Sequence, residues 1–116
     1  METLSFSRSL PVRQDVDVFI AGGGPAGMAA AVTAVRQGCR VFLAEGQACF
    51  GGMGTAGLVP AFMQFTDGVN FLAAGFGQEI YDRLKTKRAV PDDFPASSVS
   101  INVEDLKRVY DELAEE

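Results

Sequence analysis

The sequence contains no histidine and only two cysteines, which removes whole classes of functional site. The cysteines, Cys39 and Cys49, have nine residues between them and form no CxxC pair. Protein sites for zinc and related metals need clustered cysteine and histidine ligands, so no metal site is expected. We expect both cysteines to be small buried or loop residues. So few thiols, with no cleavable signal, are compatible with a reduced, cytoplasmic setting.

Positive charge is also scarce. Ten Lys and Arg stand against 15 Asp and Glu, which gives a net charge of −5. Nucleic-acid binding requires clustered basic residues that neutralise phosphates, so this balance argues against such a partner. The one basic run, Arg83 to Arg88, is expected at a helix end, where cations complement the helix dipole. The 116 residues leave room for one globular domain.

The chain lacks a convincing membrane span, although two stretches carry no charge. Val18 to Val35 contains four glycines and a proline, and Gly46 to Thr66 contains five glycines and Pro60. These residues would interrupt a helix inside lipid. No membrane partner is therefore expected, and uncharged backbone of this kind better fits a cofactor site.

A glycine motif follows the first expected strand. The strand covers Val16 to Ala21 and is nearly all apolar, as a strand buried on both faces should be. The run Gly22-Gly23-Gly24-Pro25-Ala26-Gly27 comes next and opens an Ala-rich helix from Pro25 to Gln37. G-x-G-x-x-G between a strand and a helix is the context that a dinucleotide-binding motif requires.

Each position of the motif has a physical reason. Gly22 can adopt the angles of a tight turn, Gly24 leaves the backbone bare for a pyrophosphate, and Gly27 lets the helix lie close to the strand. Pro25 suits the first helical turn, whose free N–H groups attract an anion. The alternative is a structural turn that merely needs glycine.

A second strand, Arg40 to Glu45, ends on an acid 23 residues after Gly22. A carboxylate at this position would lie beside the ribose hydroxyls of a bound adenosine. It would repel a 2′-phosphate, so NADP is the least expected dinucleotide.

The rest of the chain is less regular. We expect a long loop over residues 46–70, a helix over about Ala73 to Lys87 and a connector at Pro91 to Pro95. Val99 to Ile101 could form a short strand, and Asn102 is expected to cap a last helix from Val103.

The fold class predicted is α/β, with a Rossmann-like parallel sheet. Residues 1–14 are expected to be an extended lead-in, and residues 15–116 the N-terminal part of a dinucleotide-binding domain. Because only two convincing parallel strands occur, we expect the domain to be incomplete at its C-terminus.

Four segments resemble known flavoproteins. DVDVFIAGGGPAGMAAAVTAVRQGCRVFLAE resembles the start of the glutathione-reductase-type FAD domain. EGQACFGGMGTAGLVPAF is similar to a bacterial FAD-dependent oxidoreductase family with Gly-Gly-Met-x-Thr-Ala-Gly after its second strand. GFGQEIYDRL and NVEDLKRVYDELAEE resemble that family's next two helices, so the resemblance covers about residues 10–116.

The resemblance implies that residues 15–116 are the N-terminal part of an FAD-binding domain, a Rossmann-like domain of the FAD/NAD(P)-binding class. The FAD diphosphate would lie at the glycine motif and its adenosine ribose on Glu45. The loop from Gly51 to Met53 would lie along the diphosphate toward the flavin ring. The candidate cofactor-binding residues are Gly22, Gly23, Gly24, Pro25, Ala26, Gly27, Glu45, Gly51, Gly52 and Met53.

No catalytic residue can be named from the sequence. Disulfide reductases of similar fold carry redox cysteines where this chain has Gly54 and Val59, so no dithiol forms there. Cys49 has no local partner, although a single thiol near a flavin is an open alternative. Thr55 could donate a hydrogen bond near the ring, but a turn-stabilising hydroxyl is the simpler interpretation.

The leading hypothesis is therefore the FAD-binding segment of an oxidoreductase that acts on an unknown small molecule. The alternative is a truncated dinucleotide-binding module without activity, and an NAD-binding domain is disfavoured by the second glycine cluster. The chain alone is expected to be inactive and to self-associate through an incomplete sheet.

Overall fold

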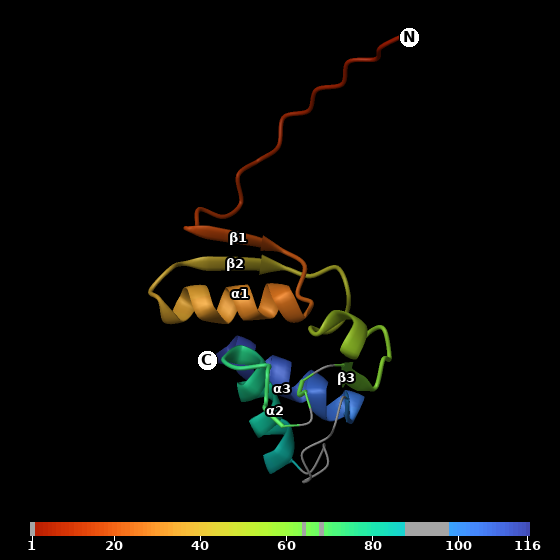
Figure 1. Cartoon of the computed structure of the whole chain (residues 1–116). Helices are drawn as coiled ribbons and strands as arrows, with labels where there is room; N and C mark the ends of the chain where they lie inside the picture. The colour runs from red at the N-terminus through yellow and green to blue at the C-terminus, as the bar shows by residue number, and fades with distance from the viewer. Residues whose placement is uncertain (1, 64, 68, 88–97) are drawn as a thin grey trace.

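The structure is a computed structural model that describes residues 2–63, 65–67, 69–87 and 98–116. Residues 2–15 are exposed, form no helix or strand, and extend away from the remainder of the chain (Figure 1). The remainder is mixed α/β, with one parallel and one antiparallel pair of strands.

A β-α-β unit forms the first half. Strand β1 (Val18–Ala21) lies parallel to β2 (Val41–Ala44), with Val18 opposite Val41. Helix α1 (Pro25–Arg36) connects them and packs on one face of this small sheet (Figure 1). Two parallel strands joined by a helix are the arrangement that the sequence pattern predicts.

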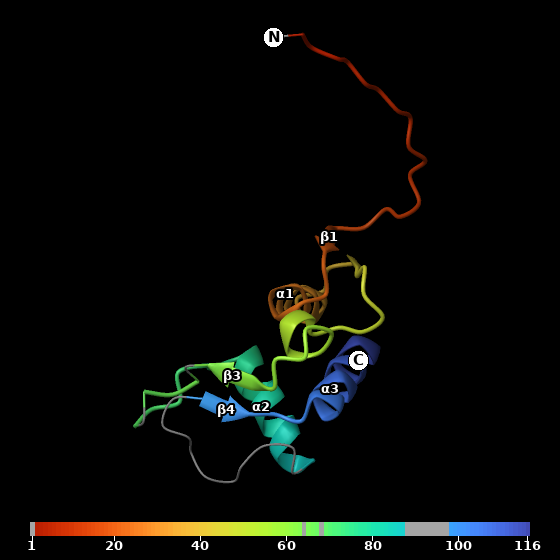
Figure 2. The same cartoon turned by 90° about the vertical axis from the view of Figure 1, so that its right-hand side faces the viewer.

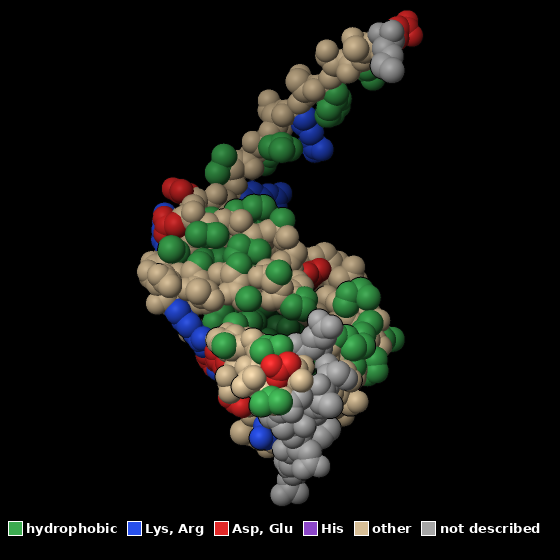
Figure 3. Space-filling view, in the orientation of Figure 1, with side chains coloured by type: hydrophobic (Ala, Val, Ile, Leu, Met, Phe, Trp, Pro, Cys, Tyr) green, Lys and Arg blue, Asp and Glu red, His purple; other side chains and the backbone are tan. Residues whose placement is uncertain are grey.

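The other face of this sheet is exposed, so the expectation that β1 is buried on both faces was wrong. Phe19 is 62% exposed and Phe42 is 38% exposed, and their rings stack with centroids 6.0 Å apart. Figure 3 shows hydrophobic side chains on the surface over these strands. The physical reason is that α1 covers one face of this sheet, and no other described helix packs on the opposite face.

The second half contains two short strands and two helices. Strand β3 (Ala61–Met63) pairs antiparallel with β4 (Ser98–Ser100), as Figure 2 shows. The expected loop over residues 46–70 was therefore wrong in part, since it contains β3 and a 3-10 turn, η1 (Gly52–Gly54). The expected strand at Val99 to Ile101 is present, shifted by one residue. The connector at Pro91 to Pro95 lies outside the described residues.

Helices α2 (Phe76–Thr86) and α3 (Val103–Glu115) supply most of the core. Helix α2 begins later than the predicted Ala73 because Gly75, with φ 67°, precedes it in a non-helical conformation. Helix α3 begins as predicted, and the Asn102 side chain accepts hydrogen bonds from two first-turn backbone N–H groups. The fully buried core side chains of these helices are Leu84, Leu106, Val109 and Tyr110.

An ion-pair network joins the ends of the three helices. Arg36 of α1 contacts Glu79 of α2 at 2.7 Å, and Arg83 contacts both Glu79, at 2.8 Å, and Glu116, at 2.6 Å. The C-terminal end of α1 is thereby held against the helical half of the molecule.

Candidate cofactor site

The first glycine turn links β1 to α1 and is hydrogen-bonded to β2. Gly22 has φ 101°, which favours glycine, and its N–H donates to the Ala44 carbonyl at 2.7 Å. A Cβ added to Gly27 would lie 1.8 Å from the Gly22 carbonyl oxygen. The first turn of α1 therefore packs on the glycine turn at a distance that only glycine permits, as the sequence predicts.

The N-terminus of α1 is open. Gly24 is its N-cap and Pro25 its first residue, with Ala26 exposed beside them. Within the described residues no side chain caps this end, and its first turn contains no acidic residue. A Cβ added to Gly24 would meet nothing within 4 Å. The positive end of the helix dipole therefore faces open space that an anion can enter.

Glu45 reaches back to the same turn. Its carboxylate accepts one hydrogen bond from the Gln47 N–H at 2.7 Å and another from the Gly23 N–H at 2.5 Å. These two donors, Gln47 first, hold the pKa of Glu45 below its ordinary value. Because an ionised carboxylate has about four acceptor positions, Glu45 can hold the turn and still accept from another hydroxyl.

The second glycine turn lies directly against the first. The Gly51 N–H donates to the Gly23 carbonyl at 2.8 Å, and a Cβ added to Gly52 would lie 3.2 Å from the Gly24 Cα. Both Figure 1 and Figure 2 place this segment beside the N-terminal end of α1. Met53 follows and is 67% exposed. The structure thus brings together the two glycine groups that the sequence separates.

Two aromatic rings support these turns. A Cβ added to Gly23 would lie 2.5 Å from Phe50 Cδ1, and one added to Gly51 would lie 2.7 Å from Cδ2 and Cε2 of Tyr110. The sequence analysis missed both roles. The one available signal was the position of Tyr110 on the apolar face of its helix, which does not identify its contact.

Thr55 stabilises the second turn. Its side chain is fully buried, and its hydroxyl donates to the Phe50 carbonyl. This is the turn-stabilising role that the sequence favours. Cys39 and Cys49 are both free thiols of intermediate exposure.

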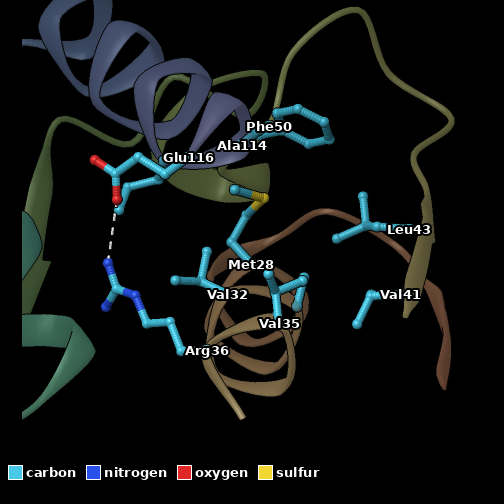
Figure 4. Close-up of a pocket in the computed structure, with 11 residues that line it drawn as sticks. Met28, Val32, Val35, Arg36, Val41, Leu43, Phe50, Ala114 and Glu116 are labelled. Atoms are coloured by element: carbon cyan, nitrogen blue, oxygen red, sulfur yellow. Dashed lines mark hydrogen bonds and ion pairs between the residues drawn. The ribbon is translucent and has the colours of Figure 1, made fainter. Parts of the chain in front are cut away.

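A separate apolar cavity of about 310 Å³ lies between the β-α-β unit and α3 (Figure 4). Met28 and Val32 of α1 face Leu43 of β2 across it, and the Arg36–Glu116 ion pair lies at its rim. None of its lining residues belongs to either glycine turn. Phe50 lines the cavity and also packs on Gly23, so the cavity adjoins the candidate site without including either glycine turn.

No helix in the described part of the chain is long and apolar enough to span a bilayer. The residues described also include no group of three or more His, Cys, Asp or Glu side chains that could hold a metal ion.

Comparison with known proteins identifies the family. Residues 17–116 match the family model described as FAD dependent oxidoreductase. No curated protein and no solved structure matches the chain. The matched range contains both glycine turns and Glu45, and the family's cofactor is FAD. The chain therefore belongs to the FAD-dependent oxidoreductase family.

Proposed function

We propose that this chain is the FAD-binding segment of a flavin-dependent oxidoreductase, with a Rossmann-like fold of the glutathione-reductase type. The diphosphate of FAD binds at the N-terminus of α1, across Gly22, Gly24 and Gly27. The observation that carries the proposal is the contact between Gly52 and Gly24, because it gathers two glycine turns around an uncapped helix end.

The other residues have defined roles in this proposal. Pro25 and Ala26 open the helix without a side chain that would obstruct an anion, and Gly23 is oriented by its hydrogen bond to Glu45. Glu45 accepts from the adenosine ribose with its remaining lone pairs. The segment from Gly51 through Gly52 to Met53 lies along the diphosphate.

FAD supplies the hydride and electron transfer, while these residues bind and orient it. The proposed partner is a small-molecule substrate rather than a nucleic acid, since the net charge is −5. The free thiols fit the reduced cytoplasm that we propose as its setting. The alternative, a dinucleotide-binding module without catalysis, draws support from the uncovered sheet face at Phe19 and Phe42.

A pair of matched glycine variants tests the site. Gly24→Ala adds a methyl group to open space, so the free chain should lose at most about 1 kcal/mol of stability. The same methyl group stands where the diphosphate must approach, so the Kd for FAD should rise at least about tenfold, or ~1.4 kcal/mol. FAD titration followed by flavin fluorescence measures this change.

Gly38→Ala is the control, because Gly38 also faces open space but follows the far end of α1, and its φ of 86° makes this variant the less stable of the two. It should leave the Kd for FAD unchanged. Equal Kd values for the two variants would contradict a diphosphate at Gly24. Flavin reduction by a substrate would separate the oxidoreductase from the inactive module.

A further inference from the structure

We infer that Tyr110 is a positioning residue for the cofactor site, whose ring holds the Gly51–Gly52 turn against Gly24. The contact exists without a cofactor, but its consequence for FAD rests on the proposed function.

The first step is the contact itself. Tyr110 lies on α3 and is fully buried. A methyl group on Gly51 would come within 2.7 Å of the ring edge and within 2.6 Å of Thr55 Cγ2. Gly51 is therefore enclosed between Tyr110 and Thr55, in a left-handed conformation with φ 102° that suits glycine.

The position of Gly51 determines where the second glycine turn meets the first. The Gly51 N–H donates to the Gly23 carbonyl, and the next residue, Gly52, lies against the Gly24 Cα. A movement of Gly51 into the volume of a missing ring would therefore alter both contacts. The ring sets how closely the second glycine turn approaches the first.

The ring of Tyr110, and not its hydroxyl, makes the contact with the turn. The Tyr110 hydroxyl is buried and has no hydrogen-bond partner within the described residues. An unpaired buried hydroxyl lowers stability, so the part of this side chain that stabilises the turn is its aromatic ring. Burial also raises the pKa of Tyr110 to about 12, so the group is neutral at physiological pH.

The experiment compares Tyr110→Phe and Tyr110→Leu in the full chain. Amide hydrogen exchange of Gly51 without FAD reports the turn, and the Kd for FAD reports the site. Tyr110→Leu should raise the Gly51 exchange rate and the Kd at least about tenfold. Tyr110→Phe should retain both wild-type values, because it keeps the ring.

Tyr81→Leu is the matched control. Tyr81 is a buried tyrosine on α2 whose ring packs on Phe71, with centroids 5.2 Å apart. The Tyr81→Leu variant should be less stable than the wild type, but its Gly51 exchange rate should not rise selectively. If Tyr110→Leu is unfolded by circular dichroism, Tyr110→Met takes its place.

The inference is overturned if the Leu and control variants show the same Gly51 exchange, or if the Phe variant behaves like the Leu variant. It is also overturned if the turn loosens while the Kd for FAD stays unchanged. A wild-type chain that binds no FAD would instead refute the proposed function, and the exchange comparison would still decide whether Tyr110 holds the turn.

Discussion

Glu45 shows how one side chain can serve both the fold and the cofactor. Its carboxylate already accepts from the N–H groups of Gln47 and Gly23, and we propose that it also accepts from the ribose. The lowered pKa keeps it ionised at neutral pH. Its charge is therefore present whether or not FAD is bound.

We predict that Glu45→Ala raises the Kd for FAD severalfold, because one charged hydrogen-bond partner of the ribose is removed. Because the pKa of Glu45 lies below 4.5, the wild-type contribution should persist above that pH and be lost as the pH falls through the lowered pKa. The Kd for FAD, measured by fluorescence at pH 7 and at a series of pH values below 4.5, checks both effects.

The exposed acid Glu115, on α3, supplies the control variant Glu115→Ala. Flavin retention by Glu45→Ala equal to that of the control would remove Glu45 from the site.

At the residue scale, the sequence predicts what a local motif contains. The steric need for Gly27 follows from its spacing after Gly22, and the structure agrees. Phe50 and Tyr110 could not be predicted in the same way. They contact Gly23 and Gly51 across large sequence separations, and no local spacing encodes such a contact.

At the element scale, the ion-pair network at the helix ends makes the free energy of unfolding depend on pH. Hydrogen bonds from Arg36, and then from Arg83, lower the pKa of Glu79 from 4.5 to about 2. The folded state gains its full stabilisation above the ordinary pKa of 4.5, and that gain is lost as the pH falls toward 2.

Glu79→Gln should therefore lower the free energy of unfolding by about 1 kcal/mol at pH 7. Between pH 5 and pH 2 it should lose less stability than the wild type, because it lacks the titrating group. Urea unfolding at several pH values measures this difference. Glu104→Gln, which removes a pair within one helix, is the control, and parallel pH curves for wild type and Glu79→Gln would contradict the prediction.

Elements with strong local signals were predicted well. Helix α3 has an N-cap at Asn102 and an apolar stripe, and it begins where expected. Strand β3 could not be predicted, since three residues show no periodicity and their partner strand lies far along the chain. The start of α2 was placed too early because the conformation of Gly75 depends on its surroundings.

At the scale of the whole molecule, the sheet and the N-terminal segment expose apolar surface together. Leu4 and Phe6 are 97% and 86% exposed, in addition to Phe19 and Phe42. Within the described residues β1 pairs with β2 alone. Exposed apolar surface and an unpaired strand edge both favour association.

We predict that the chain self-associates at micromolar concentration and that Phe19→Lys reduces this association, because it places charge on the uncovered sheet face. Size-exclusion chromatography with light scattering measures the mass. Leu72→Lys, which changes an exposed apolar residue outside the sheet, should have less effect. A monomeric wild-type chain would contradict the prediction.

The mixed α/β class with a parallel pair could be predicted from the order of strand, glycine turn, helix and strand. The burial of that pair could not, because β1 and β2 are apolar at every position. The sequence of such strands does not indicate which face of the sheet is packed against other elements. Cover depends on the rest of the molecule.

The uncapped N-terminus of α1 also has a consequence for the stability of the protein in the cell. The first turn of α3 is capped by the Asn102 side chain, but within the described residues no side chain caps the first turn of α1. A diphosphate in that position would act as the missing cap, so acquiring the flavin and folding would be one coupled equilibrium. A ligand of the native state at a hundredfold excess over its Kd adds about 2.7 kcal/mol of stability. The supply of flavin in the cell would then help to set how much of this chain survives proteolysis.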